Sequence, residues 1–248
     1  MQLYFIRHGQ SINNANWNTP DYIESPDPVL TELGIAQAQA TAAYLAQYQP
    51  ITDTNVWNVH NRFGYGITHI YASFMERAVH TASYLADKLQ VPFAAWEQIH
   101  ESGGIYGRDG EDKLQGLPGK TRGWYEAHYP TFALPESLDG SGWWHNRPHE
   151  SEEQANERAK IVWADLLARH RDQPGREEQR VVFVSHGGFF VHLLCAILDQ
   201  PWRAASQGLN SWFMLNNCSL SRIDVHKNEV SICYLNRTDY LPDHLISA

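Results

Sequence analysis

Cysteine is scarce in this sequence, and long apolar runs are missing. The 248 residues include three cysteines, an odd number at wide spacing, which argues against a disulfide framework or a zinc site. We expect Cys195, Cys218 and Cys233 to be reduced residues of the core. The apolar stretch at residues 3–6 is too short for a signal peptide or a transmembrane helix, so the expected location is the cytoplasm.

Positive charge is also in short supply. The chain has 19 Lys and Arg against 28 Asp and Glu, a formal net charge of −9 with histidine counted as neutral. Extended polyanions need clustered cations, so nucleic acid and anionic membranes are excluded as partners. A compact anion is not excluded, because it responds to local positive groups. With 43% hydrophobic and 19% charged residues, the chain is expected to form one globular domain over residues 1–248.

Short apolar runs alternate with helical patterns along most of the chain. Residues 3–6, 67–72 and 181–184 predict buried strands. Helical spacing predicts helices from Thr31 towards Pro50, over about 78–89, from Ser151 towards Pro174, and from Gly188 to about residue 199. Residues 218–225 and 230–235 predict an antiparallel pair. This order predicts a three-layer α/β/α fold with a mostly parallel mixed sheet.

Residues 101–147 interrupt this rhythm. The segment is rich in Gly, Trp, Tyr, Pro and His and has no sustained period, so we interpret it as an irregular cap insertion within the single domain. Trp143 and Trp144 either line a substrate pocket or pack the cap on the sheet. Four cations either serve a larger anionic substrate or are solvated, namely Arg108, Lys113, Lys120 and Arg122.

Chemically active side chains follow three of the predicted strands. Arg7 and His8 follow the first strand, Arg77 follows the second, and His186 follows the valine-rich strand. The carboxyl ends of parallel strands meet at one edge of a sheet, so we expect these side chains to lie together. A neutral imidazole is a nucleophile, and guanidinium groups match a phosphoryl group in shape and charge. The group therefore predicts phosphoryl transfer without a metal or cofactor.

Two further features complete this predicted site. Helix N-termini after Gly9 and Gly187 would add backbone N–H donors for a phosphoryl oxygen. A proton donor for the leaving oxygen is also needed, and Glu101, at the start of the insertion, is the candidate.

Five segments of the sequence carry a family resemblance. They are LYFIRHGQS at 3–11, DPVLTELGIAQA at 27–38, SFMERAVHTA at 73–82, ES at 150–151 with Arg158, and VSHGG at 184–188. In this order they resemble the motifs of the histidine phosphatase superfamily, also called phosphoglycerate mutase-like, and the resemblance extends along almost the whole chain.

The resemblance implies a role for each site residue. His8 would be the nucleophile and would become phosphohistidine. Glu101 would protonate the leaving alcohol and then deprotonate the attacking water. The phosphoryl oxygens would be held by Arg7, Asn14, Arg77, His186 and Gly187. The implied activity is that of a histidine acid-type phosphatase, a phosphoric monoester hydrolase, with a small phosphorylated substrate.

Three alternatives stay open on the sequence. The spacing from Glu101 to Tyr106 departs from the family pattern, so Glu97 and Glu111 are also candidates for the acid. A phosphoglycerate mutase would share the site, and the LQGL stretch at 114–117 resembles one in mutases. Against it, two glycines follow His186 where mutases have Gly-Asn, and paired arginines for a substrate carboxylate are missing. A non-catalytic phospholigand-binding scaffold is the third alternative.

Overall fold

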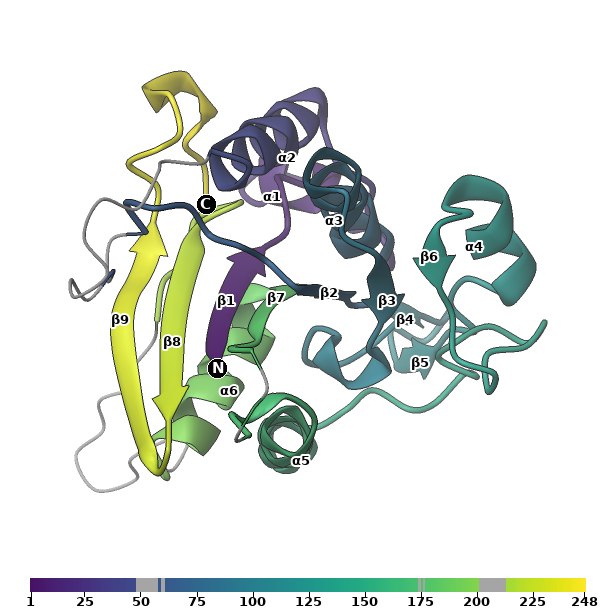
Figure 1. The fold of residues 1–248 in the computed structure, drawn as a ribbon. Coiled ribbons are helices and arrows are strands. Elements are labelled where there is room, and N and C mark those ends of the chain that lie inside the picture. The colour runs from purple at the N-terminus through teal and green to yellow at the C-terminus, as the bar shows by residue number, and fades with distance from the viewer. Residues whose placement is uncertain (48–57, 59–60, 174, 176, 201–212) are drawn as a thin grey trace, which may run out of the picture.

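One seven-stranded sheet forms the centre of the protein (Figure 1). The structure, a computed structural model, describes residues 1–47, 58, 61–173, 175, 177–200 and 213–248. The strand order is β6-β3-β2-β7-β1-β8-β9. The strands are β1 (Gln2–Arg7), β2 (His69–Ala72), β3 (Phe93–Ala95), β6 (Phe132–Ala133), β7 (Arg180–Ser185), β8 (Leu220–His226) and β9 (Glu229–Arg237). β8 runs antiparallel to β1 and β9, and the other neighbours are parallel, which confirms the predicted mixed sheet.

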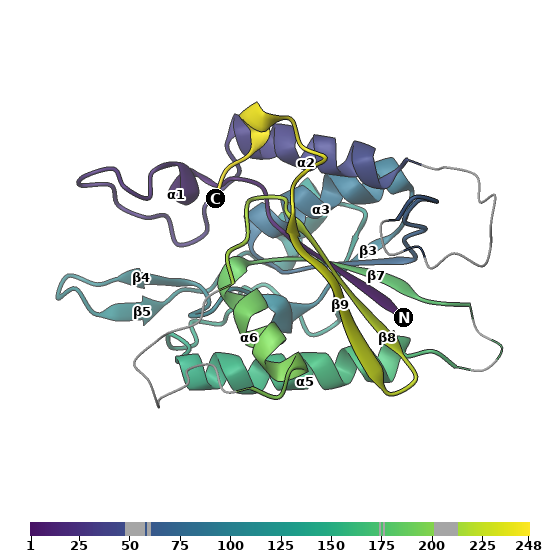
Figure 2. The same ribbon diagram turned by 90° about the vertical axis from the view of Figure 1, so that its left-hand side faces the viewer.

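Helices cover both faces of the sheet, so the three-layer prediction is confirmed. α2 (Glu32–Leu45) and α3 (Glu76–Leu89) lie on one face, and α5 (Glu152–His170) and α6 (Gly187–Ile197) lie on the other (Figure 2). Short helices α1 (Ile12–Ala15), η1 (Glu97–Ile99) and η2 (Asp243–Leu245) lie in the connections. No helix within the described part of the chain is long and apolar enough to cross a membrane.

The two layers of helices bury alternate side chains of β1. Tyr4 and Ile6 belong to the apolar cluster under α2 and α3, whereas Leu3 and Phe5 belong to the cluster under α5 and α6. A strand buried on both faces needs apolar residues at every position. Each such side chain contributes about 1.5–3 kcal/mol by its burial, so the central strands anchor the fold.

Helix starts follow their capping residues, but one helix end differs from the prediction. The Thr31 hydroxyl accepts a hydrogen bond from the Gly34 amide at 3.0 Å, and Ser151 forms a capping box with Gln154. The prediction that α2 continues towards Pro50 is wrong, because the helix ends at Leu45. Pro50 itself lies outside the described residues.

Residues 101–147 contain several short elements joined by loops. β4 (Tyr106–Arg108) and β5 (Leu114–Gly116) form a hairpin, α4 (Arg122–His128) follows, and β6 adds an edge strand to the main sheet. Trp143 and Trp144 are buried, and Trp143 packs on Phe74 with 5.8 Å between ring centroids. The two tryptophans therefore pack the segment onto the sheet, and neither is among the residues that line the cavity beside His8.

The late antiparallel pair is present as predicted, although one of its residues departs from expectation. Cys233, on β9, is half-buried, whereas Cys195 and Cys218 are buried, and all three are free thiols.

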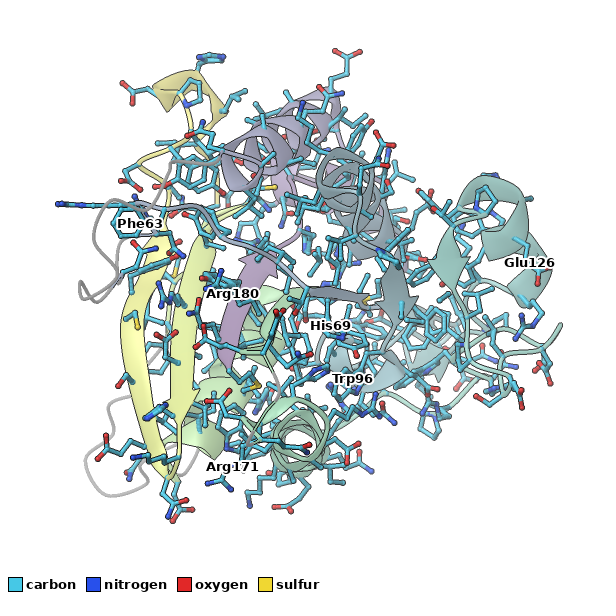
Figure 3. All side chains as sticks on the ribbon, viewed as in Figure 1. Phe63, His69, Trp96, Glu126, Arg171 and Arg180 are labelled. Carbon is cyan, nitrogen blue, oxygen red and sulfur yellow. The ribbon has the colours of Figure 1, made fainter. Side chains whose placement is uncertain are left out.

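Arg171, at the end of α5, donates a hydrogen bond to the Lys227 carbonyl at 3.1 Å and so holds the β8–β9 turn (Figure 3).

A close backbone contact joins α2 to the segment after β1. A Cβ atom on Gly34 would lie 2.1 Å from the Gln10 carbonyl oxygen, and one on Gly9 would lie 2.4 Å from the Gly34 carbonyl oxygen. The Gln10 amide also donates to the Gln37 side chain at 2.8 Å. The start of α2 is thereby fixed against the residues that directly follow His8.

Gly34→Ala tests this contact. We expect a loss of about 1–3 kcal/mol in the free energy of unfolding, because a methyl group there displaces backbone. Gly123→Ala is the matched control, since Gly123 is also helical and has no atom within 4 Å of its Cβ position. Alanine there should be neutral or stabilising by up to about 1 kcal/mol. Urea denaturation of both variants measures the difference, and equal midpoints would contradict the contact.

Candidate active site

The structure brings together the four residues expected at the sheet edge. Arg7 ends β1 and His8 follows it, Arg77 lies in the first turn of α3, and His186 is the N-cap of α6. β1, β7 and β2 are neighbours in the sheet, which places these residues side by side. The His8 and His186 rings lie 5.1 Å apart between centroids, and Arg77 Nε lies 3.0 Å from His8 Nε2.

The contacts of His8 define its protonation state. Its Nδ1 lies 2.7 Å from the Gly9 carbonyl oxygen, which can only accept a hydrogen bond, so Nδ1 carries the proton. Its Nε2 then holds a lone pair and accepts the hydrogen bond from Arg77. Burial, followed by the charges of Arg77 and Arg7, lowers the pKa of His8 well below its ordinary value. His8 is therefore a neutral imidazole with an unprotonated Nε2.

Residues just before β8 hold His8 in place through hydrogen bonds. The buried Asn217 side chain donates hydrogen bonds to the His8 carbonyl at 3.1 Å and to Asn14 Oδ1 at 3.3 Å, and Ser247 Oγ donates to Asn217 at 3.0 Å. The Cys218 amide donates to the Arg7 carbonyl at 3.0 Å. The sequence analysis missed Asn217. Recognising that β8 pairs antiparallel with β1 would have placed the residues before β8 beside those after β1.

His186 and Arg7 each keep a polar atom unpaired. His186 Nε2 lies 2.9 Å from Ser73 Oγ, and Arg7 donates to the Leu215 carbonyl. His186 Nδ1 and Arg7 Nε are buried and have no hydrogen-bond partner among the described residues. Burial, and then the Arg77 charge, lowers the pKa of His186 well below its ordinary value, so this ring is also neutral. Unpaired buried polar atoms of this kind are usually completed by a ligand or water.

The Glu101 carboxylate lies at the N-terminus of α6. It accepts hydrogen bonds from the amides of Phe189 at 2.8 Å, Gly188 at 3.1 Å and Ser102 at 2.9 Å. The positive end of the helix dipole favours a carboxylate in this place. A Cβ atom on Gly188 would lie 2.5 Å from Glu101 Oε1, so the carboxylate fits there only because residue 188 is glycine.

The other two candidate acids lie elsewhere. Glu97 pairs with Arg147 at 2.6 Å, and Glu111 pairs with Lys113 at 2.6 Å in an exposed position. Neither lines the cavity beside His8, whereas Glu101 does. Of the three carboxylates considered from the sequence, Glu101 is the one that faces the nucleophile.

The loop that carries Glu101 is held by a buried ion pair. Arg158 forms a two-point contact with Glu150 at 2.7 and 2.6 Å and also donates to the carbonyls of Gln98 at 2.5 Å and His100 at 3.1 Å. These carbonyls belong to the residues just before Glu101. The contacts give a physical reason for the spacing of Glu150 and Arg158, one of the segments that carry the family resemblance.

A cavity of about 800 Å³ opens above these residues. Of the site residues expected from the sequence, it is lined by Arg7, His8, Asn14, Arg77 and Glu101. His186 and Gly187 are not among the lining residues, and His186 is fully buried next to His8. The cavity walls come from residues 11–28, around α1, and from residues 102–108, which lead into the β4–β5 hairpin. Figure 2 shows both segments projecting from the same end of the molecule.

Asp27 lies beside Arg77 at the edge of the site. One oxygen is 3.9 Å from the Arg77 guanidinium and accepts a hydrogen bond from the Glu76 amide at 3.0 Å. Burial raises the pKa of Asp27 to about 6, although the Arg77 charge opposes this shift.

Across the described residues, no three His, Cys, Asp or Glu side chains are grouped so that they could hold a metal ion.

Gly188→Ala tests the position of Glu101. The added methyl group would displace the carboxylate from the α6 amides, so we expect kcat for phosphate-ester hydrolysis to fall about 10²-fold. Gly140→Ala is the control, because its Cβ position has no atom within 4 Å. Steady-state kinetics of both variants checks the expectation. Unchanged kcat in Gly188→Ala would show that the position of Glu101 does not matter to the reaction.

The pH dependence of stability tests the neutral histidines. Burial lowers the pKa values of His8, His100 and His186 well below their ordinary value. Below pH about 6.5 the unfolded chain therefore binds protons that the folded protein does not. Each of these histidines should lower the free energy of unfolding by up to about 1.4 kcal/mol per pH unit as the pH falls.

His8→Asn isolates the contribution of the nucleophile. We expect it to flatten the decline in unfolding free energy between pH 6.5 and 5.5 by the share of one histidine, about 1 kcal/mol, because the unfolded side chain is already half protonated at pH 6.5. Urea denaturation at these two pH values compares the slopes. Identical slopes for the variant and the natural chain would mean that His8 is protonated in the folded protein.

Comparison with known proteins agrees with this geometry. The chain matches the histidine phosphatase superfamily (branch 1) over residues 3–238. It is 26% identical over 221 residues to glucosyl-3-phosphoglycerate phosphatase of Mycobacterium tuberculosis (strain CDC 1551 / Oshkosh), which covers 87% of this chain and 85% of that protein. It is also 26% identical over 225 residues to a probable phosphoglycerate mutase of Erwinia tasmaniensis, covering 90% and 85%.

The fold has solved counterparts as well. The structure of a mycobacterial glucosyl-3-phosphoglycerate phosphatase in complex with VO3 has a TM-score of 0.57 at 21% identity, and the match covers 96% of this chain and 99% of that chain. The match to the family model extends over nearly the whole sequence and includes every site residue expected from the sequence. The chain therefore belongs to the histidine phosphatase superfamily.

Proposed function

We propose that this protein is a phosphatase that hydrolyses a phosphomonoester through a phosphohistidine on His8. The observation that carries the proposal is the state of His8. Its neutral ring presents an unprotonated Nε2 at the floor of a cavity, 3.0 Å from the Arg77 guanidinium. A nucleophilic lone pair next to a fixed cation suits attack on a phosphoryl group.

The first step transfers the phosphoryl group to the enzyme. His8 Nε2 attacks phosphorus, and the bond from phosphorus to the ester oxygen breaks as the N–P bond forms. Arg7 and Arg77 neutralise the charge on the phosphoryl oxygens, and Glu101 in its protonated form gives its proton to the leaving oxygen. The alcohol leaves, and phosphohistidine and the Glu101 carboxylate remain.

The second step releases phosphate. The Glu101 carboxylate takes a proton from a water molecule, whose oxygen attacks phosphorus while the N–P bond breaks. Inorganic phosphate leaves, His8 is neutral again, and Glu101 is protonated for the next cycle. In total, one ester and one water give one alcohol and one phosphate. The α6 amides hold Glu101 in one place for both proton transfers.

The remaining site residues complete the phosphate-binding group. Asn14 lines the cavity, and its Oδ1 already accepts hydrogen bonds, so its NH2 group is available to a phosphoryl oxygen. His186 and Arg7 each have an unpaired nitrogen that could bind a phosphoryl oxygen, namely Nδ1 of His186 and Nε of Arg7. Gly187 lies beside Arg7, since a Cβ atom there would be in ordinary contact with Arg7 Nε at 3.7 Å. Its backbone N–H at the helix start is a further donor.

Hydrolysis is favoured over the mutase reaction by two observations. Gly188, at the position where mutases have Asn after the second histidine motif, is in contact with the Glu101 carboxylate and leaves no room for a side chain. Arg122, considered for the substrate carboxylate, pairs with Glu126 at 3.2 Å and does not line the cavity. One similar protein is named a probable phosphoglycerate mutase, so the mutase reaction is measured alongside hydrolysis.

His8→Ala tests the proposal. We expect hydrolysis of 4-nitrophenyl phosphate to fall by about 10³-fold or more, because the nucleophile is lost. The matched control is His226→Ala, whose side chain is 74% exposed in the distant β8–β9 hairpin. Rapid acid-free quenching with labelled substrate should trap phosphohistidine in the natural chain and in His226→Ala, but not in His8→Ala.

Three results would contradict the proposal. Retained turnover in His8→Ala would exclude His8 as the nucleophile. Efficient interconversion of phosphoglycerate isomers with a bisphosphate primer would favour the mutase. Failure to trap phosphohistidine with any phosphate ester would favour a binding scaffold.

A further inference from the structure

Four large aromatic or apolar side chains lie among the polar residues that wall the outer part of the cavity. Trp17, Tyr22 and Ile23 come from the segment around α1, and Tyr106 comes from β4. Trp17 is 74% exposed and Ile23 is 89% exposed, although large apolar side chains are usually buried. Exposed apolar side chains gathered at a cavity indicate a surface that a ligand covers.

The wall around α1 is held in place by its own hydrogen bonds. The Tyr22 hydroxyl donates to Asn13 Oδ1 at 2.9 Å. The Asn13 side chain also donates to the Ser25 carbonyl at 2.9 Å and accepts from the Ser25 amide at 3.0 Å. These contacts fix the Tyr22 part of the wall before a ligand binds, which lowers the cost of ordering that part on binding.

The charges of the outer cavity balance one another. Beyond the phosphate-binding residues and Glu101, the charged residues lining it are Arg108 and Glu24. Arg108 pairs with Asp112 at 3.3 Å and donates to its carbonyl at 3.0 Å. Burial raises the pKa of Tyr106, and the Glu24 carboxylate adds to this shift, which places a negative charge near that ring. The outer cavity thus gives a second anion no net attraction.

Three of the other cations of the insertion are engaged in ion pairs, as Arg147 is with Glu97. Lys113 pairs with Glu111 at 2.6 Å, Lys120 pairs with Glu76 at 3.1 Å, and Arg122 pairs with Glu126 at 3.2 Å. Glu126 lies on α4 at the periphery of the molecule (Figure 3). None of these three cations lines the cavity. The alternative that they serve a larger anionic substrate has no support from their positions.

Resting on the proposed phosphatase function, we propose a substrate class for this cavity. The substrate is a phosphomonoester whose alcohol carries an aromatic or other apolar group close to the ester oxygen and no second anionic group. The phosphoryl group binds at His8, Arg7 and Arg77, and the apolar group lies against Trp17 and Tyr106. A carboxylate on the alcohol, as in a phosphoglycerate, would find only Arg108 as a cation among the described residues of the outer cavity, and Arg108 is already paired with Asp112.

Three esters of primary alcohols test the substrate class without changing the chemistry. We compare kcat/KM for 2-phenylethyl phosphate, ethyl phosphate and 3-phosphoglycerate, whose leaving oxygens are of one kind. We expect 2-phenylethyl phosphate to exceed ethyl phosphate by about tenfold or more, as apolar pockets discriminate by such factors. We expect 3-phosphoglycerate to be no better than ethyl phosphate.

Trp17→Ala then tests the wall itself. Its exposure means that the variant should fold normally, and we expect the ratio of the 2-phenylethyl to the ethyl value to fall about fivefold or more. Ile161→Ala is the control, because Ile161 is an apolar side chain on α5, 58% exposed and not part of the cavity. Its ratio should match that of the natural chain.

The outcomes separate the substrate class from the phosphatase function. Hydrolysis of all three esters at similar kcat/KM, a preference for 3-phosphoglycerate, or an unchanged ratio in Trp17→Ala would overturn the substrate class and leave the phosphatase function intact. Hydrolysis of none of them, nor of 4-nitrophenyl phosphate, would overturn both.

Discussion

The chemistry of this protein depends on the burial of one imidazole between two guanidinium groups. Arg7 and Arg77 repel a proton from His8, burial disfavours the charged ring further, and the Gly9 carbonyl takes the single remaining N–H. These effects act in the same direction. They leave a neutral ring whose Nε2 lone pair accepts a hydrogen bond from Arg77. The two cations that keep the ring neutral are also the groups that a phosphoryl anion needs.

Different parts of the fold carry different components of the site. The nucleophile and its arginines stand at the ends of rigid parallel strands or at the helix start that follows one, where positions are well defined. The proposed acid comes from the loop after η1 and rests on α6, and the buried Glu150–Arg158 pair holds that loop. The outer walls come from segments outside the sheet. The proposed catalytic residues and the surfaces proposed to select the substrate are thus carried by different parts of the chain.

Much of this arrangement is readable from sequence because buried strands and capped helices are local signals. β1 and β7 are apolar at successive positions since both faces are covered, and Thr31 and Ser151 mark helix starts by their own hydrogen bonds. The meeting of Arg7, His8, Arg77 and His186 follows from one rule about parallel strands.

What sequence reasoning missed depends on contacts between distant residues. β3 has three residues and β6 has two, so neither has a readable period. β3 forms because it pairs with β2, and β6 forms because it pairs with β3 at the sheet edge. Spacing could not choose among Glu97, Glu101 and Glu111, because only the fold shows which of them faces the cavity. The support of His8 by Asn217 depends on the unforeseen pairing of β8 with β1.

That support has a consequence for how the protein is made. Asn217 and His8 are 209 positions apart in the chain. At ordinary ribosome speeds His8 emerges about 10–40 s before Asn217. A nascent chain therefore carries its nucleophile long before it has the residue that holds it, and contacts over such separations form slowly. The first strand to be synthesised carries part of the site, but the contacts that complete the site come from residues that are synthesised among the last.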